Sequence, residues 1–506
     1  MRQIRFSRWA KIPVILLLTT TVSFAQPDPQ PAPRPSGSAL PRMGAPQLLN
    51  LWEQQPRAVQ ELYNACYQVL SARPEATFAD VAADANVQRL CQENRIEHLG
   101  GPMLGQVAPD GARVWLRTCR PANVEVRVTV DGVERTCGPV RSSAETDLAA
   151  IVPVTGLKPG TRYAYRVLVD GVPIKIPDHA AIVTAPAQTD AASVRIAFGT
   201  CAHRFGLGNA KQAQAIRDRQ PAAMLLYGDV AVQDRKNHFG LHRADYLLRD
   251  FQPAWQGLAA AVPVYAAWDD HDYFANDLSG LPPGFSEQDR AGVWRVFRRS
   301  WNNPSYGFGE QGRGIFFRTR IGPCDILFTD GRYFRERGAF LGNEQMQWLE
   351  RQLLDCQGPF IILESSTMWS DYVSNGKDSW GKFDNAGRER IFELIEKNRI
   401  AGVLLISGDR HGARVFRIPR PSGFTFYEFE PASLGGIDWG PRATMPNCPD
   451  QLFGHLGYAF GEFTIDAAPA DPTVTFRLID EEGQAMHEMT LKRSQLTPQA
   501  VKRTAP

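Results

Sequence analysis

Three acidic residues surround one histidine in the segment WDDHD, residues 268–272, directly after the apolar run VPVYAA, residues 262–267. Unpaired carboxylates repel one another, and burying them without a partner is costly. The apolar run has the composition of a buried strand, so the acidic residues stand where a strand leaves the core. The chain as a whole is nearly neutral, with a formal net charge of +2, so the local cluster indicates a bound cation.

Two other apolar runs end in the same way, at YGDV (residues 227–230) and SGDRH (residues 407–411). A single aspartate after a strand most often caps a turn or a helix. Three such strand ends in one sheet are different, because together they supply several carboxylates and imidazoles, which bind metal ions. The predicted cluster consists of Asp229, Asp269, Asp270, His271, Asp409 and His411.

The strands that must position these residues recur from residue 193 onward and alternate with helical patterns. They read VRIAFGTC, AAMLLYGD, VPVYAAWDD, CDILFTD, PFIILESS and GVLLISGD. Near-continuous apolar runs are typical of strands that are buried on both faces and covered by helices. Ligand sites in such sheets lie at the carboxyl ends of the strands. The residues expected there are Cys201, Asp229, Asp270, Asp330 and Asp409.

A different period is found over residues 101–188, where apolar and polar residues alternate. In VEVRVTVDG, valines at every second position precede Asp131-Gly132, a pair typical of a tight hairpin turn. Tyr163 and Tyr165 follow the turn LKPG, an arrangement that resembles the tyrosine corner of immunoglobulin-like sandwiches. The segment therefore predicts a small β-sandwich domain.

Residues 47–100, before this domain, predict a short helical segment. One apolar stripe at helical spacing consists of Val59, Leu62, Tyr63, Cys66, Val69 and Leu70. Thr77 and Asp80 match a capping box that opens a further helix.

The two ends of the chain lie outside the predicted domains. Residues 1–25 combine basic residues with a short apolar run and small residues before Ala25, which predicts a signal peptide and an exported protein, periplasmic or extracellular. Residues 26–46 predict a Pro-rich linker, and residues 491–506 a C-terminal tail. No transmembrane segment is predicted after signal cleavage, and the near-neutral charge does not support a nucleic-acid partner.

Export favours disulfide bonds among the eight cysteines of the chain. The expected pairs are Cys66–Cys91 and Cys119–Cys137, with Cys324–Cys356 as a further pair. Cys448 has no assigned role, and the connectivity as a whole does not follow from the sequence.

The motifs FGTC, GD, WDDHDY, TDGRYFR and SGDRH, in this order, resemble the PhoD-type alkaline phosphatases, a branch of the calcineurin-like metallophosphoesterase superfamily. The resemblance covers about residues 101–490, and WDDHD followed by SGDRH is its most specific part. It implies an α/β fold class. A four-layer αββα metallophosphoesterase domain over residues 193–490 would follow a small immunoglobulin- or fibronectin-like β-sandwich (101–188) and the helical N-terminal segment (47–100).

The resemblance also implies a set of metal ligands. Asp229, in the GD motif, would bridge two metal ions, and Asp270 would bind the second of them. Asp409 and His411 match the closing metal-binding motif. Cys201 stands where PhoD-type enzymes have a thiolate ligand, and the alternative for it is a buried structural cysteine.

One motif departs from the family pattern. The family supplies a tyrosine ligand from a segment resembling YRxxY, which here reads HRADY, so either His242 replaces the tyrosine or Tyr246 serves. Val232 also stands where purple acid phosphatases have a tyrosine. The family implies iron with calcium, and zinc or manganese are the alternatives if His242 is a ligand.

The resemblance places His271 beside the leaving group, where it would act as general acid, with Asp272 orienting its imidazole. Arg332 has two interpretations. Its guanidinium either clamps phosphate oxygens or forms an ion pair with Asp330 or another acidic neighbour.

The predicted function is an exported metal-dependent phosphoric ester hydrolase, an alkaline phosphatase D-like phosphomonoesterase or phosphodiesterase. A hydroxide that bridges two metal ions would attack the phosphorus of a phosphate ester substrate. Two alternatives are a phospholipase-like phosphodiesterase and a non-catalytic exported protein that binds metal or a partner. Neither the substrate nor the oligomeric state can be read from the sequence.

Overall fold

The computed structural model describes residues 43–187, 192–374, 376–436, 444–445 and 447–499. The predicted signal peptide and the predicted linker up to residue 42 lie outside the described residues. Among the helices that are described, none is both long and apolar enough to cross a membrane.

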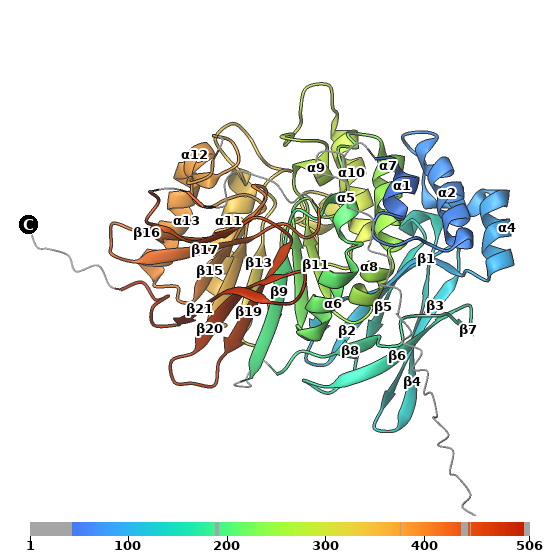
Figure 1. Cartoon of the computed structure of the whole chain (residues 1–506), viewed down its shortest axis with the longest axis horizontal. Helices are drawn as coiled ribbons and strands as arrows, with labels where there is room; N and C mark the ends of the chain where they lie inside the picture. The colour runs from blue at the N-terminus through green and yellow to red at the C-terminus, as the bar shows by residue number, and fades with distance from the viewer. Residues whose placement is uncertain (1–42, 188–191, 375, 437–443, 446, 500–506) are drawn as a thin grey trace, which may run out of the picture. The chain divides into compact units, whose positions relative to one another are not determined.

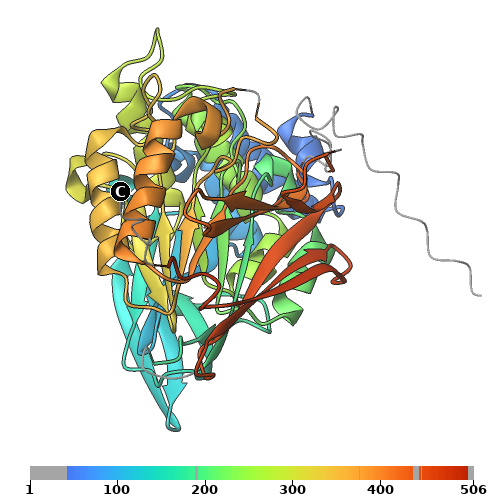
Figure 2. The same cartoon turned by 90° about the vertical axis from the view of Figure 1, so that its left-hand side faces the viewer.

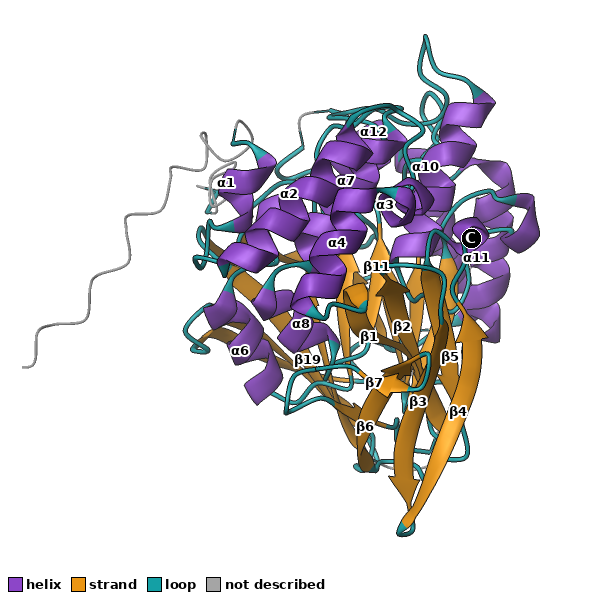
Figure 3. Cartoon of the chain, turned by 90° about the vertical axis from the view of Figure 1, so that its right-hand side faces the viewer, coloured by secondary structure: helices purple, strands orange, loops and turns teal. Residues whose placement is uncertain are grey.

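The N-terminal segment is helical, as its periodicity predicts. Its helices are α1 (Ala45–Leu49), α2 (Arg57–Ser71), α3 (Phe78–Ala83) and α4 (Ala85–Asn94). Thr77 and Asp80 form the expected capping box, because each backbone N–H donates to the side chain of the other residue. The apolar face of α2 packs on α7 (Phe239–Asp250), so this segment is docked on a helix of the domain that follows (Figure 3).

Two antiparallel sheets follow, and their inward-facing residues form one shared apolar cluster, as the alternating pattern predicts. The first sheet has the order β1-β2-β5, with β1 (His98–Ala108), β2 (Gly111–Thr118) and β5 (Ala149–Val154). The second has the order β4-β3-β6-β7 with β8 also on β6: β3 (Asn123–Val130), β4 (Val133–Arg141), β6 (Arg162–Val169), β7 (Val172–Pro173) and β8 (Ala181–Val183). A 3-10 turn, η2, spans Ala144–Thr146.

Two local features of this β-sandwich confirm the sequence analysis. Asp131 and Gly132 connect β3 to β4 with positive φ angles of 53° and 80°, the backbone that a two-residue hairpin turn requires. The Tyr163 hydroxyl accepts a hydrogen bond from the backbone N–H of Lys158 at 2.9 Å, which is the contact of a tyrosine corner.

The rest of the chain contains two larger mixed sheets, whose strands stand beside one another in Figure 1. One has the order β11-β10-β9-β19-β20-β21. Its strands are β9 (Ser193–Gly199), β10 (Ala223–Tyr227), β11 (Val264–Ala267), β19 (Ala459–Asp466), β20 (Thr473–Asp480) and β21 (Ala485–Lys492). Strands β9, β10 and β11 are parallel, whereas β19 pairs antiparallel with β9.

The other sheet has the order β12-β13-β14-β15-β17-β16-β18. Its strands are β12 (Phe317–Ile321), β13 (Cys324–Phe328), β14 (Phe360–Glu364), β15 (Val403–Ile406), β16 (Ala413–Pro419), β17 (Thr425–Pro431) and β18 (Gln451–His455). Strands β13, β14 and β15 are parallel, so their carboxyl ends share one edge of the sheet.

In the sheet that contains β13, β14 and β15, successive residues face opposite sides, and their contacts define the layers. Leu327 and Leu363 pack with helices α11 (Gly342–Asp355) and α13 (Asn385–Asn398), which Figure 2 shows side by side in yellow and orange. Their neighbours Ile326 and Ile362 belong to the apolar cluster that contains Phe198 of β9, in the other large sheet. Strands of the sheet that contains β9, β10 and β11 pack with α6 (Ala210–Asp218), α7, α8 (Pro253–Ala259) and α10 (Glu287–Ser300). The layers are helices, sheet, sheet and helices, which confirms the predicted αββα class.

The expected disulfide bonds Cys66–Cys91, Cys119–Cys137 and Cys324–Cys356 are wrong in this structure, because all eight cysteines are free thiols. For one pair the topology gives the reason. Cys119 follows β2 in one sheet of the sandwich, whereas Cys137 lies on β4 of the other sheet, directly opposite Val126 of β3. The Cys119 thiol donates instead to the backbone oxygen of Ile96 at 3.3 Å.

Candidate metal centre

The carboxyl ends of the central strands carry the residues that the sequence analysis selected. Asp229 follows β10, and Asp270 follows β11 as the first residue of the short helix α9 (Asp270–Tyr273). Asp409 follows β15 in the other sheet. The parallel pairing of each set of strands aligns these ends, so residues far apart in the sequence meet at one place.

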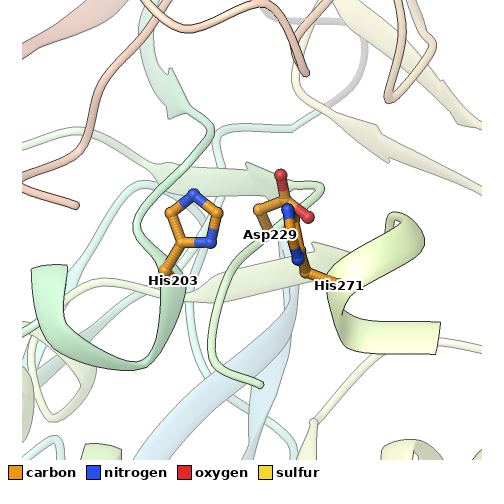
Figure 4. Close-up of side chains that lie close together, drawn as sticks. All are labelled: His203, Asp229 and His271. Atoms are coloured by element: carbon orange, nitrogen blue, oxygen red, sulfur yellow. The ribbon is translucent and has the colours of Figure 1, made fainter. Parts of the chain in front are cut away.

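Side chains from these ends form two groups that could hold a metal ion. One group contains His203, Asp229 and His271, and the other contains Asp229 with Asp269, Asp270 and Asp409. Within each group the ligand atoms lie within 4.8 Å of one another. Figure 4 shows the first group, with His203 on helix α5 (His203–Gly206) and His271 on α9 near the Asp229 carboxylate. Asp229 is the residue that the two groups share.

His203 was not selected from the sequence, although a signal for it exists. It stands two residues after Cys201, directly beyond β9, in the segment CAH. The side chain is fully buried, and neither ring nitrogen makes a hydrogen bond within the described part of the chain. Burial lowers the pKa of His203 well below its usual range, and His271 and His411 lower it further. The neutral ring is the form that binds metal ions.

Arg332 supplies the positive charge that the buried aspartates need. Its Nε and Nη2 atoms both donate to the carboxylate of Asp269, with Nη2 2.9 Å from Oδ2, and both side chains are buried. The same guanidinium lies 3.9 Å from Asp270 and 3.8 Å from Asp409. Of the two interpretations of Arg332, the structure therefore contains the ion pair, with Asp269 and not with Asp330 as the partner.

Two carboxylates of the cluster each have one oxygen without a hydrogen-bond partner in the described chain. Asp229 Oδ1 and Asp409 Oδ2 are buried and have no hydrogen-bond partner among the described residues. Burial raises the pKa of both carboxyls well above the usual range, and Asp270 and Asp269 raise both values further. His271 opposes this at Asp229, and Arg332 opposes it at Asp409. Orphaned carboxylate oxygens beside orphaned imidazole nitrogens fit bound cations, so the residues present suit the metal ions that the resemblance implies.

The donor atoms differ between the two groups. His203, Asp229 and His271 offer two nitrogens and one oxygen, a set that suits zinc, manganese or iron. The aspartate group offers only oxygens, which calcium, magnesium and manganese prefer. Val232, in the position where a phenolate was considered, lies in the apolar core. The donors therefore indicate two different kinds of site without selecting the metals.

The backbone is strained at five residues of this region, all with positive φ angles and none a glycine. They are Cys201 (φ 57°), His203 (φ 50°), Asp229 (φ 52°), Asp409 (φ 71°) and His411 (φ 44°). Such residues are uncommon and gather at functional sites, where the surrounding fold holds them in place.

His271 is held by Asp234 rather than by Asp272, which corrects the sequence prediction. Nδ1 of His271 lies 2.7 Å from Asp234 Oδ1 and 2.9 Å from the side-chain nitrogen of Gln233. Burial alone would lower the pKa of His271, but Asp229 and the bond to Asp234 raise it to about 11.

Asp272 has a different task. Its two oxygens accept hydrogen bonds from the backbone N–H groups of Val230, Ala231 and Val232 at 2.9–3.0 Å. The turn after Asp229 is therefore fixed by Asp272, because the three amides of that turn converge on one buried carboxylate.

The two alternatives for the ligand in HRADY, His242 and Tyr246, both lie on α7 and make other contacts. Nε2 of His242 lies 2.8 Å from the backbone oxygen of Lys236, and His242 belongs to neither metal group. The Tyr246 hydroxyl accepts a hydrogen bond from the Trp301 indole at 3.3 Å. The choice between His242 and Tyr246 as a ligand stays a prediction.

The remaining predicted ligands lie beside the groups without belonging to them. The ring of His411 stacks on that of His203, with centroids 5.4 Å apart. The Cys201 thiol is buried next to the Thr200 hydroxyl at 3.4 Å, and burial together with Asp229 raises its pKa well above the usual range. The ligand role of Cys201 stays a prediction.

Comparisons with known proteins agree with the fold. A solved structure described as the structure of PhoD is similar with a TM-score of 0.65 and 17% identity, covering 80% of this chain and 92% of that chain. The purple acid phosphatase PPD1 from yellow lupin (Lupinus luteus) seeds has a TM-score of 0.58 and 15% identity, with coverage of 78% and 74%. At these identities the likeness concerns the fold alone. A comparison with curated protein sequences finds no significant match.

The fold and the clustered ligands together define a metal-dependent phosphoesterase. Residues 208–476, more than half of the chain, match the family model described as PhoD-like phosphatase. The chain belongs to the PhoD-like phosphatase family and is a phosphoric ester hydrolase. Residues 96–187, which contain the β-sandwich, match a model described as Domain of unknown function (DUF7800).

Proposed function

We propose that this chain is an exported phosphatase in which Asp229, Asp270 and Asp409 hold two metal ions and His271 protonates the leaving group. The observation that carries the proposal is the sharing of Asp229 between two ligand groups, one of which contains a histidine fixed by Asp234. Metal ions, when bound, lower the pKa of a water nucleophile and offset charge on the phosphoryl oxygens.

The ion pair between Arg332 and Asp269 determines how many carboxylates are left to bind metal ions. Because Arg332 neutralises Asp269 with two hydrogen bonds, three carboxylates of the cluster remain for cations. The Ser366 hydroxyl also donates to Asp269 at 2.8 Å and holds the carboxylate in this orientation.

The contacts of His271 support its role as a proton donor. Its Nδ1 atom is engaged by Asp234, so Nε2 is the ring atom left to donate a proton to a departing oxygen. A general acid contributes most when the leaving group is strongly basic. The role of His271 can therefore be tested by varying the leaving group.

His271→Ala should lose about 10²–10³-fold in kcat on glycerol phosphate, whose alkoxide needs a proton to depart. The loss on p-nitrophenyl phosphate should be much smaller, since p-nitrophenolate departs without one. Asp234→Asn should show the same selectivity with a smaller loss, because it loosens the ring without removing it. Steady-state kinetics on the two substrates measure both effects.

Metal content distinguishes this role from ligation, since His271 also lies in one of the ligand groups. Elemental analysis of His271→Ala should give the wild-type metal stoichiometry. An equal loss on both substrates with metals retained would mean that His271 binds the phosphoryl group, and an equal loss with metals missing would make it a ligand.

Export is supported by the N-terminal pattern of residues 1–25. We expect cleavage after Ala25, so that the mature chain begins at Gln26. N-terminal sequencing of the protein recovered from a periplasmic or secreted fraction tests this, and retention of residues 1–25 on a cytoplasmic product would contradict it.

A further inference from the structure

Two arginines of the loop after β13, Arg332 and Arg335, are buried, and the sequence analysis considers only the first. Arg335 is 8% exposed. Its Nη2 atom donates to the backbone oxygen of Lys377 at 2.6 Å. Its guanidinium stacks 4.4 Å from the ring centre of Phe340 and 4.0 Å from that of Phe383. These contacts fix the plane of the guanidinium.

Each of the two arginines has one spare donor. Nη1 of Arg332 and Nη1 of Arg335 are buried and have no hydrogen-bond partner among the described residues. A buried donor on a charged group is costly to leave without an acceptor. Burial and the neighbouring Arg332 lower the pKa of Arg335 to about 10, so it still carries its charge at neutral pH. Two buried guanidinium donors without acceptors among the described residues indicate a missing acceptor, for which an anion is suited.

The surroundings place this pair at the aspartate group. Nη2 of Arg332 lies 3.8 Å from Asp409 and 3.9 Å from Asp270. Further contacts link Arg335 to this group. Arg335 donates to the backbone oxygen of Lys377, and the Lys377 ammonium pairs with Asp277. The backbone N–H of Asp277 in turn donates to Asp270 Oδ2 at 2.6 Å. The anion that the arginines lack therefore belongs next to the metal ligands, which is where the phosphoryl group of a substrate is expected.

We propose that Nη1 of Arg335, together with Nη1 of Arg332, binds the non-bridging oxygens of the phosphoryl group and makes the site selective for phosphomonoesters over diesters. The inference rests on the proposed function of the metal centre. It assigns Arg335 as a substrate-binding residue, whereas Arg332 both neutralises Asp269 and contacts the substrate.

The selectivity follows from charge and geometry. A monoester dianion has three terminal oxygens and two negative charges, whereas a diester has two terminal oxygens and one charge. Two terminal oxygens of the substrate would face the bound metal ions, so the spare Nη1 donors of the two arginines require a third terminal oxygen, which a diester lacks. The favoured substrates are therefore monoesters of alcohols.

The test compares Arg335→Gln and Arg335→Lys with the control Arg337→Gln, which changes an exposed arginine of the same loop. Three quantities are measured on metal-loaded protein: kcat/KM for p-nitrophenyl phosphate, kcat/KM for bis(p-nitrophenyl) phosphate, and the Kd of inorganic phosphate by calorimetry. Arg335→Gln should lose about 10- to 100-fold on the monoester and in phosphate affinity, the value of a hydrogen bond to a charged group. On the diester it should stay within about threefold, and the control should resemble wild type.

Arg335→Lys separates binding from packing, since it keeps the charge and most of the stem above the two aromatic rings. It should unfold at the wild-type temperature and still lose about tenfold in phosphate affinity, because an ammonium cannot donate to the Lys377 oxygen and to the anion in the planar geometry of the guanidinium. Phosphate affinity equal to wild type in a folded Arg335→Lys or Arg335→Gln protein overturns the proposal. An equal loss on both esters with unchanged phosphate affinity also overturns it and makes Arg335 a structural residue.

The failure of the proposed function would look different. If wild type hydrolyses neither ester but binds phosphate in a manner that depends on Arg335, the anion site stands and the catalytic assignment is wrong. If wild type hydrolyses both esters and the Arg335 variants do too, at unchanged rates and phosphate affinities, the catalytic assignment stands and the anion site is wrong.

Discussion

Asp229→Asn should lower kcat/KM for p-nitrophenyl phosphate by about 10⁴-fold in metal-supplemented enzyme. The effect is large because Asp229 is the residue that the two ligand groups of the described chain share. One substitution therefore weakens both groups, whereas a change at Asp409 alters only one of them. Elemental analysis should show a loss of bound metal in parallel with the loss of rate.

The same substitution should have opposite effects on stability with and without metal. In metal-free protein Asp229 is 1% exposed, and burial and the neighbouring Asp270 and Asp269 raise its pKa. An uncharged amide of similar shape therefore removes the cost of burying a charge and the repulsion from these two carboxylates. The chelated variant should unfold at or above the temperature of chelated wild type. With metal at a hundred times its Kd, wild type gains about 2.7 kcal/mol, most of which the variant lacks.

Thermal unfolding of wild type and of Asp229→Asn, each with chelator and with metal, tests whether the order of their unfolding temperatures reverses. Asp325→Asn is a suitable control, because Asp325 is another fully buried aspartate and accepts hydrogen bonds from Arg318 at 2.9 Å and from the backbone of Gly358 at 2.6 Å. That variant should be less stable in both conditions with unchanged metal content. Full metal stoichiometry in Asp229→Asn would contradict the shared-ligand assignment.

The parts of the site that the sequence predicts are those carried by strand ends. Asp229, Asp270 and Asp409 each lie two or three residues after the end of an apolar strand, and parallel strands in one sheet bring their carboxyl ends together. In the same way, Asp131-Gly132 predicts a hairpin because only a few residues permit its backbone. A short sequence pattern therefore predicts the geometry where neighbouring residues alone determine the backbone.

Partners that come from loops could not be predicted in this way. Asp234 and His271 are 37 residues apart, and Arg332 and Asp269 are 63 residues apart. The sequence shows an acidic residue next to His271, namely Asp272, but the helical turn of α9 directs that carboxylate to the backbone amides after Asp229. Nearness along the chain therefore suggested the wrong partner.

The cysteines illustrate the same limit. Cys119 and Cys137 flank a predicted hairpin, which suggests a pair, but Cys119 precedes the hairpin at the end of β2 in the other sheet of the sandwich. A disulfide bond needs a fixed approach of two side chains, and spacing in the sequence does not supply it. His203 differs from these cases because a local signal for it exists: it stands two residues after Cys201, a predicted ligand.

Arg332→Gln should destabilise the metal-free protein by about 3–5 kcal/mol, the usual cost of removing one partner of a buried ion pair. Asp269 is fully buried, and both of its oxygens accept hydrogen bonds from this one guanidinium. Glutamine cannot replace either the charge or the fork. The variant is compared in the chelated state, because bound cations would otherwise supply part of the missing charge.

Arg390→Gln provides a control with the same geometry on the surface. Arg390 donates from Nε and from Nη2 to Glu350 at 2.6 and 2.7 Å, but the two side chains are 45% and 23% exposed. Its removal should cost no more than about 1 kcal/mol. The difference between the two variants, measured by chemical denaturation, isolates the effect of burial.

The double variant Arg332→Gln with Asp269→Asn decides whether charge is the cause. If the lone buried carboxylate destabilises Arg332→Gln, removing that charge should restore part of the lost stability, because two neutral amides of similar size then face each other. A double variant no more stable than Arg332→Gln would mean that the arginine stabilises the site by packing. The pair would then not be the source of the positive charge that allows three aspartates and a histidine to follow one buried strand.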